Sequence, residues 1–151
     1  MKTKFIIPKK RQTGMGLIEI MVAVLVLALG LLGLAALQAR ALQQNQSSLQ
    51  RSQAVMLSSS ILDSLRTDRT SAVAGAYNIG QTCAVPGANG TLTGDSISAW
   101  LQSLKDRLGQ AATTCGSITC NINGICTIRI FWDDSRAGGS ANETFETRTQ
   151  I

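Results

Sequence analysis

The chain has 151 residues, a formal net charge of +5 and no histidine. The length suits one domain of ordinary size. The absence of histidine excludes His-based catalytic triads and the usual His-containing zinc motifs. The charge is unevenly distributed along the chain. From residue 15 onward, nine basic residues balance nine acidic residues. The excess of five positive charges lies before residue 14, at Lys2, Lys4, Lys9, Lys10 and Arg11. The excess charge therefore indicates targeting, and we expect no nucleic-acid partner.

Residues 1–14 form a short basic leader, and residues 15–37 form an apolar run whose single charge is Glu19. As a helix, this run spans about 34 Å, which is enough to cross a bilayer core. Positive charge beside an apolar helix stays cytoplasmic, so the rest of the chain is expected on the far side. Two alternatives exist for the function of the apolar run. One is a cleaved secretory signal, with residues 39–41 as the cleavage pattern, and the other is a plain single-pass anchor. Neither accounts for Glu19.

The residues around this acid carry a family resemblance. The run Gly14-Met15-Gly16-Leu17-Ile18-Glu19, after a basic leader and before an apolar helix, resembles the class III signal of type IV pilins and pseudopilins. The resemblance implies that a prepilin peptidase cuts between Gly14 and Met15 and methylates the new Met15 amine. Met15 stands where the family usually has Phe, and Gly16 where Thr is common. The resemblance also implies that Glu19 of one subunit neutralises the amine of a neighbour, which satisfies two charges that are costly in a membrane.

A second helical half is predicted over residues 38–69, which contain no Pro and no Gly. An apolar stripe with spacings of seven and then four follows this half: Leu42, Leu49, Met56, Leu57, Ile61 and Leu65. We expect one continuous helix over residues 15–68, about 80 Å long. Its second half is expected to lay the stripe under a globular head formed with residues 70–151.

The rest of the chain predicts a loop over residues 70–92, a short helix over 95–108 and antiparallel strands. Asp95 or Ser96 is the expected cap of the short helix, and Gly109 its end. Trp100 and the apolar face of this helix are expected in the core: Ile97, Leu101, Leu104 and Leu108.

Strands are predicted over residues 117–122 and 125–132, on either side of Asn123-Gly124, a strong hairpin pattern. Residues 135–142 are expected to form a mobile turn. The last strand, over residues 143–151, is expected to place Phe145 and Thr147 on one face.

The four cysteines all lie in the distal half and predict two disulfides in an oxidising compartment. Three pairings are possible. Cys120 and Cys126 are symmetric about Asn123, so a bond across a three-residue loop is favoured, which leaves Cys83 with Cys115. Free buried thiols and a four-thiolate zinc site are the alternatives, although the chain has no C-x-x-C pair. We expect no metal and no cofactor.

Within the pilin family, the chain most resembles the minor pilins called type IV pilus modification proteins, the PilV group. The resemblance lies in three segments: residues 17–19, 29–38 and 127–134. This resemblance implies an α+β pilin-like ladle, with a long N-terminal helix packed on a small antiparallel sheet. It implies a role in priming pilus assembly, and hence in twitching motility and adhesion. The implied partners are a prepilin peptidase, other minor pilins and the major pilin. The implied location is the bacterial inner membrane, single-pass, with a cytoplasmic N-terminus and a periplasmic head, or the pilus itself.

Three alternatives remain at this point. A type II secretion pseudopilin shares the leader and the helix. A tip-exposed adhesin or DNA-uptake subunit would be a binding protein. The neutral charge beyond the leader disfavours strong binding to nucleic acid. An enzyme is not expected, because Asp133 and Asp134 have no partner motif and are interpreted as solvated turn acids.

Overall fold

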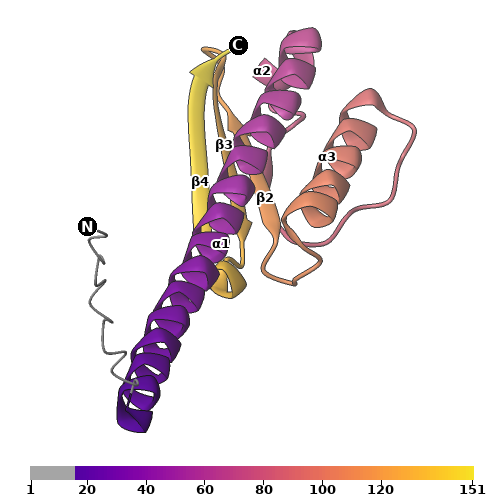
Figure 1. Cartoon of the computed structure of the whole chain (residues 1–151). Coiled ribbons are helices and arrows are strands. Elements are labelled where there is room, and N and C mark those ends of the chain that lie inside the picture. Colours follow the sequence, from indigo (N-terminus) through magenta and orange to yellow (C-terminus); the bar gives the residue numbers. More distant parts are fainter. Residues whose placement is uncertain (1–15) are drawn as a thin grey trace, which may run out of the picture. The chain divides into compact units, whose positions relative to one another are not determined.

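Helix α1 spans Leu17–Thr67 in the computed structural model, which describes residues 16–151 (Figure 1). The prediction of one continuous helix to about residue 68 is thus confirmed over the described part, where the helix ends at Thr67. Its expected first residue, Met15, lies outside the described residues. The described chain divides at Arg40 into two compact units. We call the second unit, Arg40–Ile151, the head.

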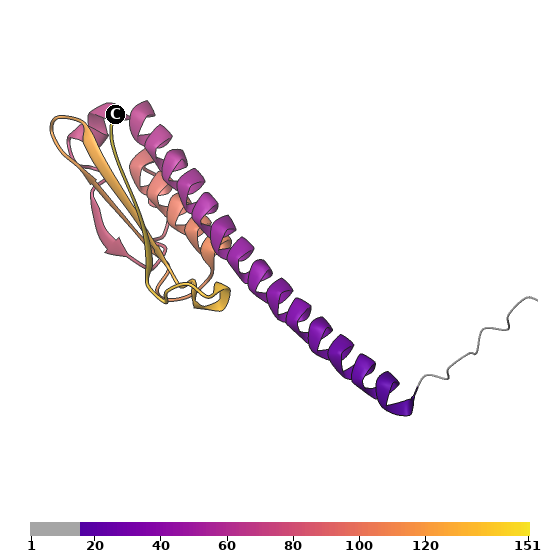
Figure 2. The same cartoon turned by 60° about the vertical axis from the view of Figure 1, so that its left-hand side comes forward.

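The head is a four-stranded antiparallel sheet with helices on one face. Its sheet order is β1-β2-β3-β4, and α3 is inserted in the chain between β1 and β2. Figures 1 and 2 show the head portion of α1 and α3 together on the same side of the sheet. The predicted α+β pilin-like layout is confirmed. The elements are α2 (Arg69–Val73), β1 (Ile79–Thr82), α3 (Leu92–Leu108), β2 (Cys115–Cys120), β3 (Ile125–Trp132), the 3-10 helix η1 (Ser135–Ala137) and β4 (Glu143–Gln150).

The buried face of α1 differs from the predicted stripe. The buried positions recur at helical spacing: Ala54, Ser58, Ile61, Leu62 and Leu65. The first half of the stripe is exposed instead, with exposed fractions of 66% for Leu42, 57% for Leu49 and 61% for Met56. The reason is angular: Met56 is two residues from Ala54, which places it about 200° away around the helix.

Helix α3 begins three residues earlier than predicted, and its cap is neither Asp95 nor Ser96. The Gly94 N–H donates to the Thr91 hydroxyl oxygen (3.1 Å), so Thr91 is the N-cap. Asp95 instead accepts the N–H groups of the preceding loop, from Asn89 and Gly90. The predicted end at Gly109 is confirmed by its N–H bond to the Lys105 carbonyl.

Trp100 joins α3 to the rest of the core, as predicted. Its side chain is 4% exposed, and its ring N–H donates to the Leu57 carbonyl of α1 (3.0 Å). The ring lies against β2 at Gly116, where a Cβ atom would be only 2.5 Å from the Trp100 ring carbons. Glycine at this position therefore lets α3 approach the sheet.

The predicted loop over residues 70–92 is wrong in part, because it contains α2 and β1. Strand β1 pairs with β2 through a register irregularity. Just before it, the Asn78 side chain bonds both backbone groups of Cys120, accepting from its N–H (2.6 Å) and donating to its carbonyl (3.1 Å). Tyr77 beside it is fully buried. These partners lie about forty residues away along the chain, so local sequence does not reveal the strand.

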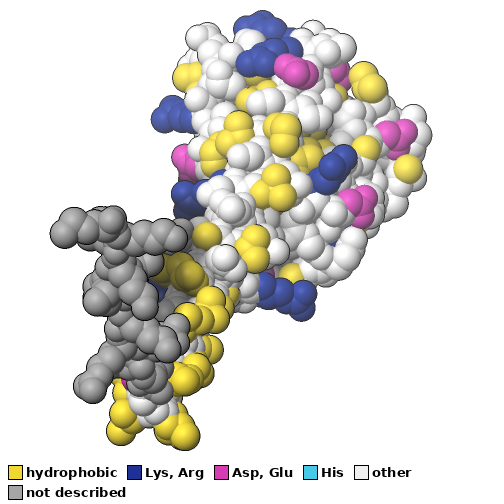
Figure 3. Space-filling model, viewed as in Figure 1, with side chains coloured by type: hydrophobic (Ala, Val, Ile, Leu, Met, Phe, Trp, Pro, Cys, Tyr) yellow, Lys and Arg dark blue, Asp and Glu magenta, His cyan; other side chains and the backbone are white. Residues whose placement is uncertain are grey.

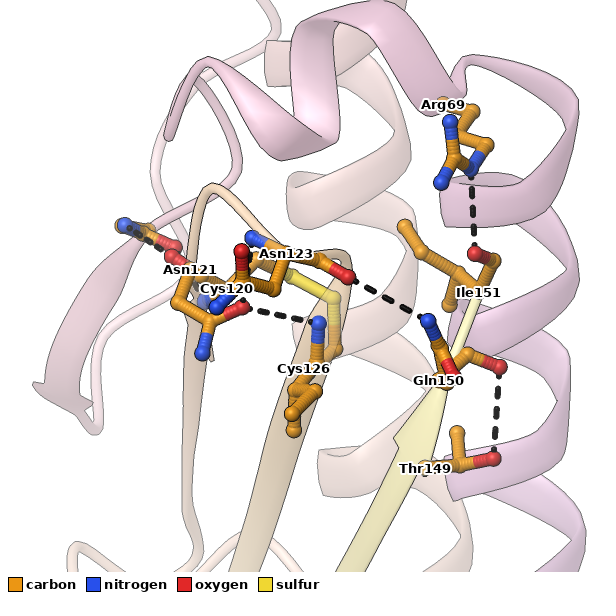
Figure 4. Close-up of a disulfide and its surroundings, with 10 residues drawn as sticks. Arg69, Cys120, Asn121, Asn123, Cys126, Thr149, Gln150 and Ile151 are labelled. Carbon is orange, nitrogen blue, oxygen red and sulfur yellow. Dashed lines mark hydrogen bonds between the residues drawn. A yellow bond between two sulfur atoms is a disulfide. The ribbon is translucent and has the colours of Figure 1, made fainter.

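The predicted hairpin is confirmed, although β2 ends at Cys120 and not at residue 122. Cys120 and Cys126 are register partners and form a disulfide. Gly124 has a φ of 76°, the left-handed value expected at the end of a three-residue loop. Figure 4 shows this loop, in which the Asn121 side-chain oxygen accepts the Ile125 N–H (2.9 Å).

Strand β4 follows the predicted alternation, with Phe145 and Thr147 half-buried on the same face. Residues 135–142, which were predicted to form a turn, contain the 3-10 helix η1. Arg51 of α1 pairs with Glu143 at the start of β4 (3.1 Å).

The second disulfide joins Cys83 to Cys115, so the favoured pairing is the one present and no free thiol remains among the described residues. We expect the Cys83→Ser/Cys115→Ser variant to lose about 4 kcal/mol of unfolding free energy, because the bond closes a separation of 32 residues. The Cys120→Ser/Cys126→Ser variant, with a separation of six, should lose about 2 kcal/mol. Urea unfolding of the full chain in detergent measures both losses, and the reverse order would contradict this account.

Candidate assembly site

Glu19 lies in the first turn of α1. Its backbone N–H donates to the Gly16 carbonyl (3.0 Å), which opens the helix. A carboxylate is favoured there, because the first N–H groups of a helix have no internal partner and its N-terminus carries partial positive charge. No Lys or Arg side chain within residues 16–151 forms an ion pair with Glu19.

The helix around Glu19 is apolar on all sides. Its large side chains from Leu17 to Leu37 are all between 50% and 76% exposed. They gather as the yellow surface of the lower part of Figure 3. A soluble monomer rarely exposes so large an apolar surface, and a helix that is hydrophobic all round is normally covered by lipid or protein. By length and composition, α1 is able to cross a membrane.

Gly14 and Met15, which form the predicted processing site, lie outside the described residues. The cut between them, the methylation of Met15 and the pairing of its amine with Glu19 therefore stay predictions. What the structure adds is the position of Glu19: it follows Gly16 by one helical turn, at the beginning of the exposed apolar surface.

The head corrects the interpretation of the paired acids after β3. Asp133 is half-buried, and the Ser135 hydroxyl and backbone N–H hold the pKa of its carboxyl below the ordinary value. Asp134 is not a solvated turn acid, because it is 1% exposed. One of its oxygens accepts the Ser47 hydroxyl of α1 (2.6 Å). Ser47 is 87 positions away in the chain, so no local pattern predicts this contact.

The cysteines form disulfides rather than a thiolate site. Within residues 16–151, no cluster of three or more His, Cys, Asp and Glu side chains is placed to hold a metal ion. The feature of the described chain that calls for a partner is therefore the exposed apolar helix with its single acid.

Comparison with protein-family models gives a match near the start of the chain. The family described as the prokaryotic N-terminal methylation motif matches residues 9–35, which is less than a fifth of the chain. Neither the curated proteins nor the solved structures gave a match. The match covers the end of the leader (residues 9–14), Glu19 and most of the apolar run. It supports a type IV pilin-like or pseudopilin-like protein, a structural subunit rather than an enzyme, that is processed by a prepilin peptidase.

Proposed function

We propose that the chain is a minor pilin of the PilV type, which helps to prime or assemble type IV pili. One observation carries the proposal: within the matched motif, the single acid of an exposed apolar helix occupies the first helical turn. An uncompensated carboxylate is costly in lipid, so its retention there favours a role in pairing with a positive group.

The proposed mechanism begins with cleavage on the cytoplasmic side. The cut after Gly14 creates a positive amine at Met15, which is then methylated. The amine and Glu19 both lie at the edge of the apolar helix. When subunits dock, Glu19 of one pairs with the amine of another, which compensates two membrane charges and fixes the axial position of the helices. The same apolar surface passes from lipid contacts to helix contacts.

The proposed location follows from charge and cysteine chemistry. The basic residues 1–14 remain cytoplasmic, the helix crosses the inner membrane once, and the head lies in the periplasm. Two disulfides in the head agree with an oxidising compartment. The proposed partners are the prepilin peptidase, other minor pilins and the major pilin.

The test of this function is deletion of the gene, followed by counts of surface pili and of secreted substrates. Fewer pili with normal secretion is the expected result. Because pseudopilins share the matched motif, normal pili with failed secretion would instead assign the chain to a type II secretion system. Normal values of both would contradict an assembly role.

Gly14→Ala is expected to block or strongly slow the removal of residues 1–14, because the added methyl group occupies the residue at which the peptidase cuts. Intact-mass measurement of the membrane-extracted protein checks this result. Thr13→Ala, beside the cut and outside the Gly–Met bond, is the matched control and should be processed normally. Complete processing of the Gly14→Ala variant would contradict the assigned site.

A further inference from the structure

Strand β4 forms one edge of the sheet, beside β3 (Figure 1). The Ile151 N–H donates to the Gly124 carbonyl (2.9 Å), so every second residue back from Ile151 directs its backbone groups toward β3. The residues between them direct theirs away from the sheet, and the first three are Thr144, Glu146 and Arg148. Within residues 16–151, the backbone N–H and C=O groups of these three form no hydrogen bond. The outer edge of β4 is therefore open to a further strand.

The two edges of the sheet differ in their capacity to pair. Strand β1, at the other edge, has four residues, and its register with β2 is irregular. Short edge strands and irregular registers normally prevent a further strand from pairing. Strand β4 has eight residues, no proline and an unbroken register with β3. It is therefore the edge that can accept a strand along its whole length.

The side chains at the outward positions of β4 carry both signs of charge. Glu146 forms an ion pair with Arg129 of β3. Arg148 lies opposite Thr127 and forms no ion pair within residues 16–151. Opposite charges directly across from one another stabilise a pair of strands, and like charges destabilise it. An added strand is therefore favoured when it places an acid opposite Arg148.

We propose that an edge strand of a different pilus subunit adds to the sheet beside β4, antiparallel to it, with Asp or Glu opposite Arg148. Its backbone groups bond those of Thr144, Glu146 and Arg148, a mode of recognition called β-augmentation. An extended polypeptide presents donors and acceptors at the spacing of this edge, whereas a lipid, a nucleic acid or a free anion does not. This inference rests on the proposed function, since it takes the partner from the same assembly.

The direction of the strands decides which edge of the partner fits. Neighbouring strands in the order β1-β2-β3-β4 are all antiparallel, so β1 and β4 run in opposite directions. A neighbour with the same layout, whose helix runs parallel to α1 on the same side of the sheet, therefore presents its first strand antiparallel to β4. Subunits anchored in one membrane share this helix direction, so the pairing is compatible with the proposed assembly.

A second copy of this chain fits the edge less well. Antiparallel pairing of β4 with the β4 of another copy reverses the direction of α1 between the copies, and two copies inserted in one membrane share that direction. The β1 strand of another copy has the correct direction, but it is too short and irregular to pair along β4. A different subunit with a longer first strand supplies both the direction and the length.

The test is site-specific photo-crosslinking of the full-length protein in piliated cells, with benzoylphenylalanine at Gln150, an exposed residue of β4. The same group at Thr119, exposed on the same face of the sheet but on the interior strand β2, is the background control. The expected product joins residue 150 to an edge strand of another pilus subunit. Moving the group to Thr144 should move the joined residue toward the partner's C-terminus, because the pairing is antiparallel.

Thr144→Pro, with the cross-linking group at Gln150, should lower the yield at least about tenfold. Proline lacks the outward N–H and leaves a carbonyl of the partner without a donor. The pairing of β4 with β3 does not use this N–H, so the fold is retained. Thr144→Ala keeps the N–H and is the matched control, with an unchanged yield. Thermal unfolding and a non-reducing gel show that each variant has folded and formed its disulfides.

Arg148→Glu should lower the yield about fivefold, because it places two acids opposite one another, and Arg148→Lys should keep it. Reversing the partner's acid to Arg should restore the yield in the Arg148→Glu background. Cross-links to another copy of this chain, to lipid or to nucleic acid would overturn the proposal. Yields at the Thr119 level, or equal yields for Thr144→Pro and Thr144→Ala, would overturn it as well.

Failure of this inference is distinguishable from failure of the proposed function. If the edge variants leave cross-linking unchanged while gene deletion still removes pili, the edge assignment alone is wrong. If deletion leaves pili unchanged, the proposed function itself is wrong.

Discussion

Glu19→Gln is expected to leave the protein in the membrane but to lower its incorporation into pili more than about a hundredfold. The variant keeps the shape of the side chain and removes the charge that the proposed assembly step pairs with an amine. A charge left buried without its partner costs about 3–5 kcal/mol, and each 1.4 kcal/mol is tenfold in equilibrium. Immunoblots of sheared pili and of membranes give the ratio of assembled to inserted protein.

Asp106→Asn is the matched control for this experiment. It removes one negative charge from an exposed acid on α3 and leaves the apolar helix intact. Its ratio of assembled to inserted protein should equal that of the wild type. A Glu19→Gln variant that enters pili as well as Asp106→Asn does would refute the role assigned to Glu19. A variant lost from the membrane would show instead that the acid serves insertion.

Trp100→Ala is expected to lower the unfolding free energy by about 3–5 kcal/mol, because it removes a large buried aromatic side chain. Trp100 is 4% exposed and contacts β2 at the position that Gly116 leaves open. Its removal leaves a cavity between α3 and the sheet. Urea unfolding of the oxidised full chain in detergent, followed by circular dichroism, measures the loss.

Trp100→Phe separates packing from hydrogen bonding in this experiment. It keeps an aromatic ring in the core but loses the bond to the Leu57 carbonyl, which is worth about 1 kcal/mol. We therefore expect its stability to lie between those of the wild type and Trp100→Ala. If Phe and Ala destabilise equally, the ring does not fill the space that the structure assigns to it.

Several features follow from short stretches of sequence alone, because their physical causes are local. In lipid a long apolar run forms a helix, because a helix satisfies all backbone hydrogen bonds within the segment, so the first half of α1 is predictable from composition. The Asn123-Gly124 pattern predicts the hairpin, since a left-handed backbone favours glycine at its last loop position. The hairpin in turn sets Cys120 opposite Cys126, and the other two cysteines then pair by elimination.

Other features depend on residues far apart in the chain. Strand β1 needs the Asn78 bonds to Cys120, and the burial of Asp134 needs Ser47 of α1. The groove lined by Gln46, Arg107 and Arg136 needs α1, the end of α3 and η1 together. Propensity and spacing describe each segment by itself, so they predict loops and solvated acids where long-range contacts form a strand and a buried side chain.

The sequence by itself determined the apolar N-terminal helix, its single acid and the hairpin, because each rests on residues within a few turns or within one loop. Among the three possible disulfide pairings it favoured Cys83–Cys115 with Cys120–Cys126. Only the tertiary structure decided which side of α1 is buried in the head. The seven-residue stripe of Leu42, Leu49 and Met56 and the buried stripe from Ala54 to Leu65 are both compatible with a helix. The choice between them depends on where the sheet and α3 pack, and that is a property of the whole head.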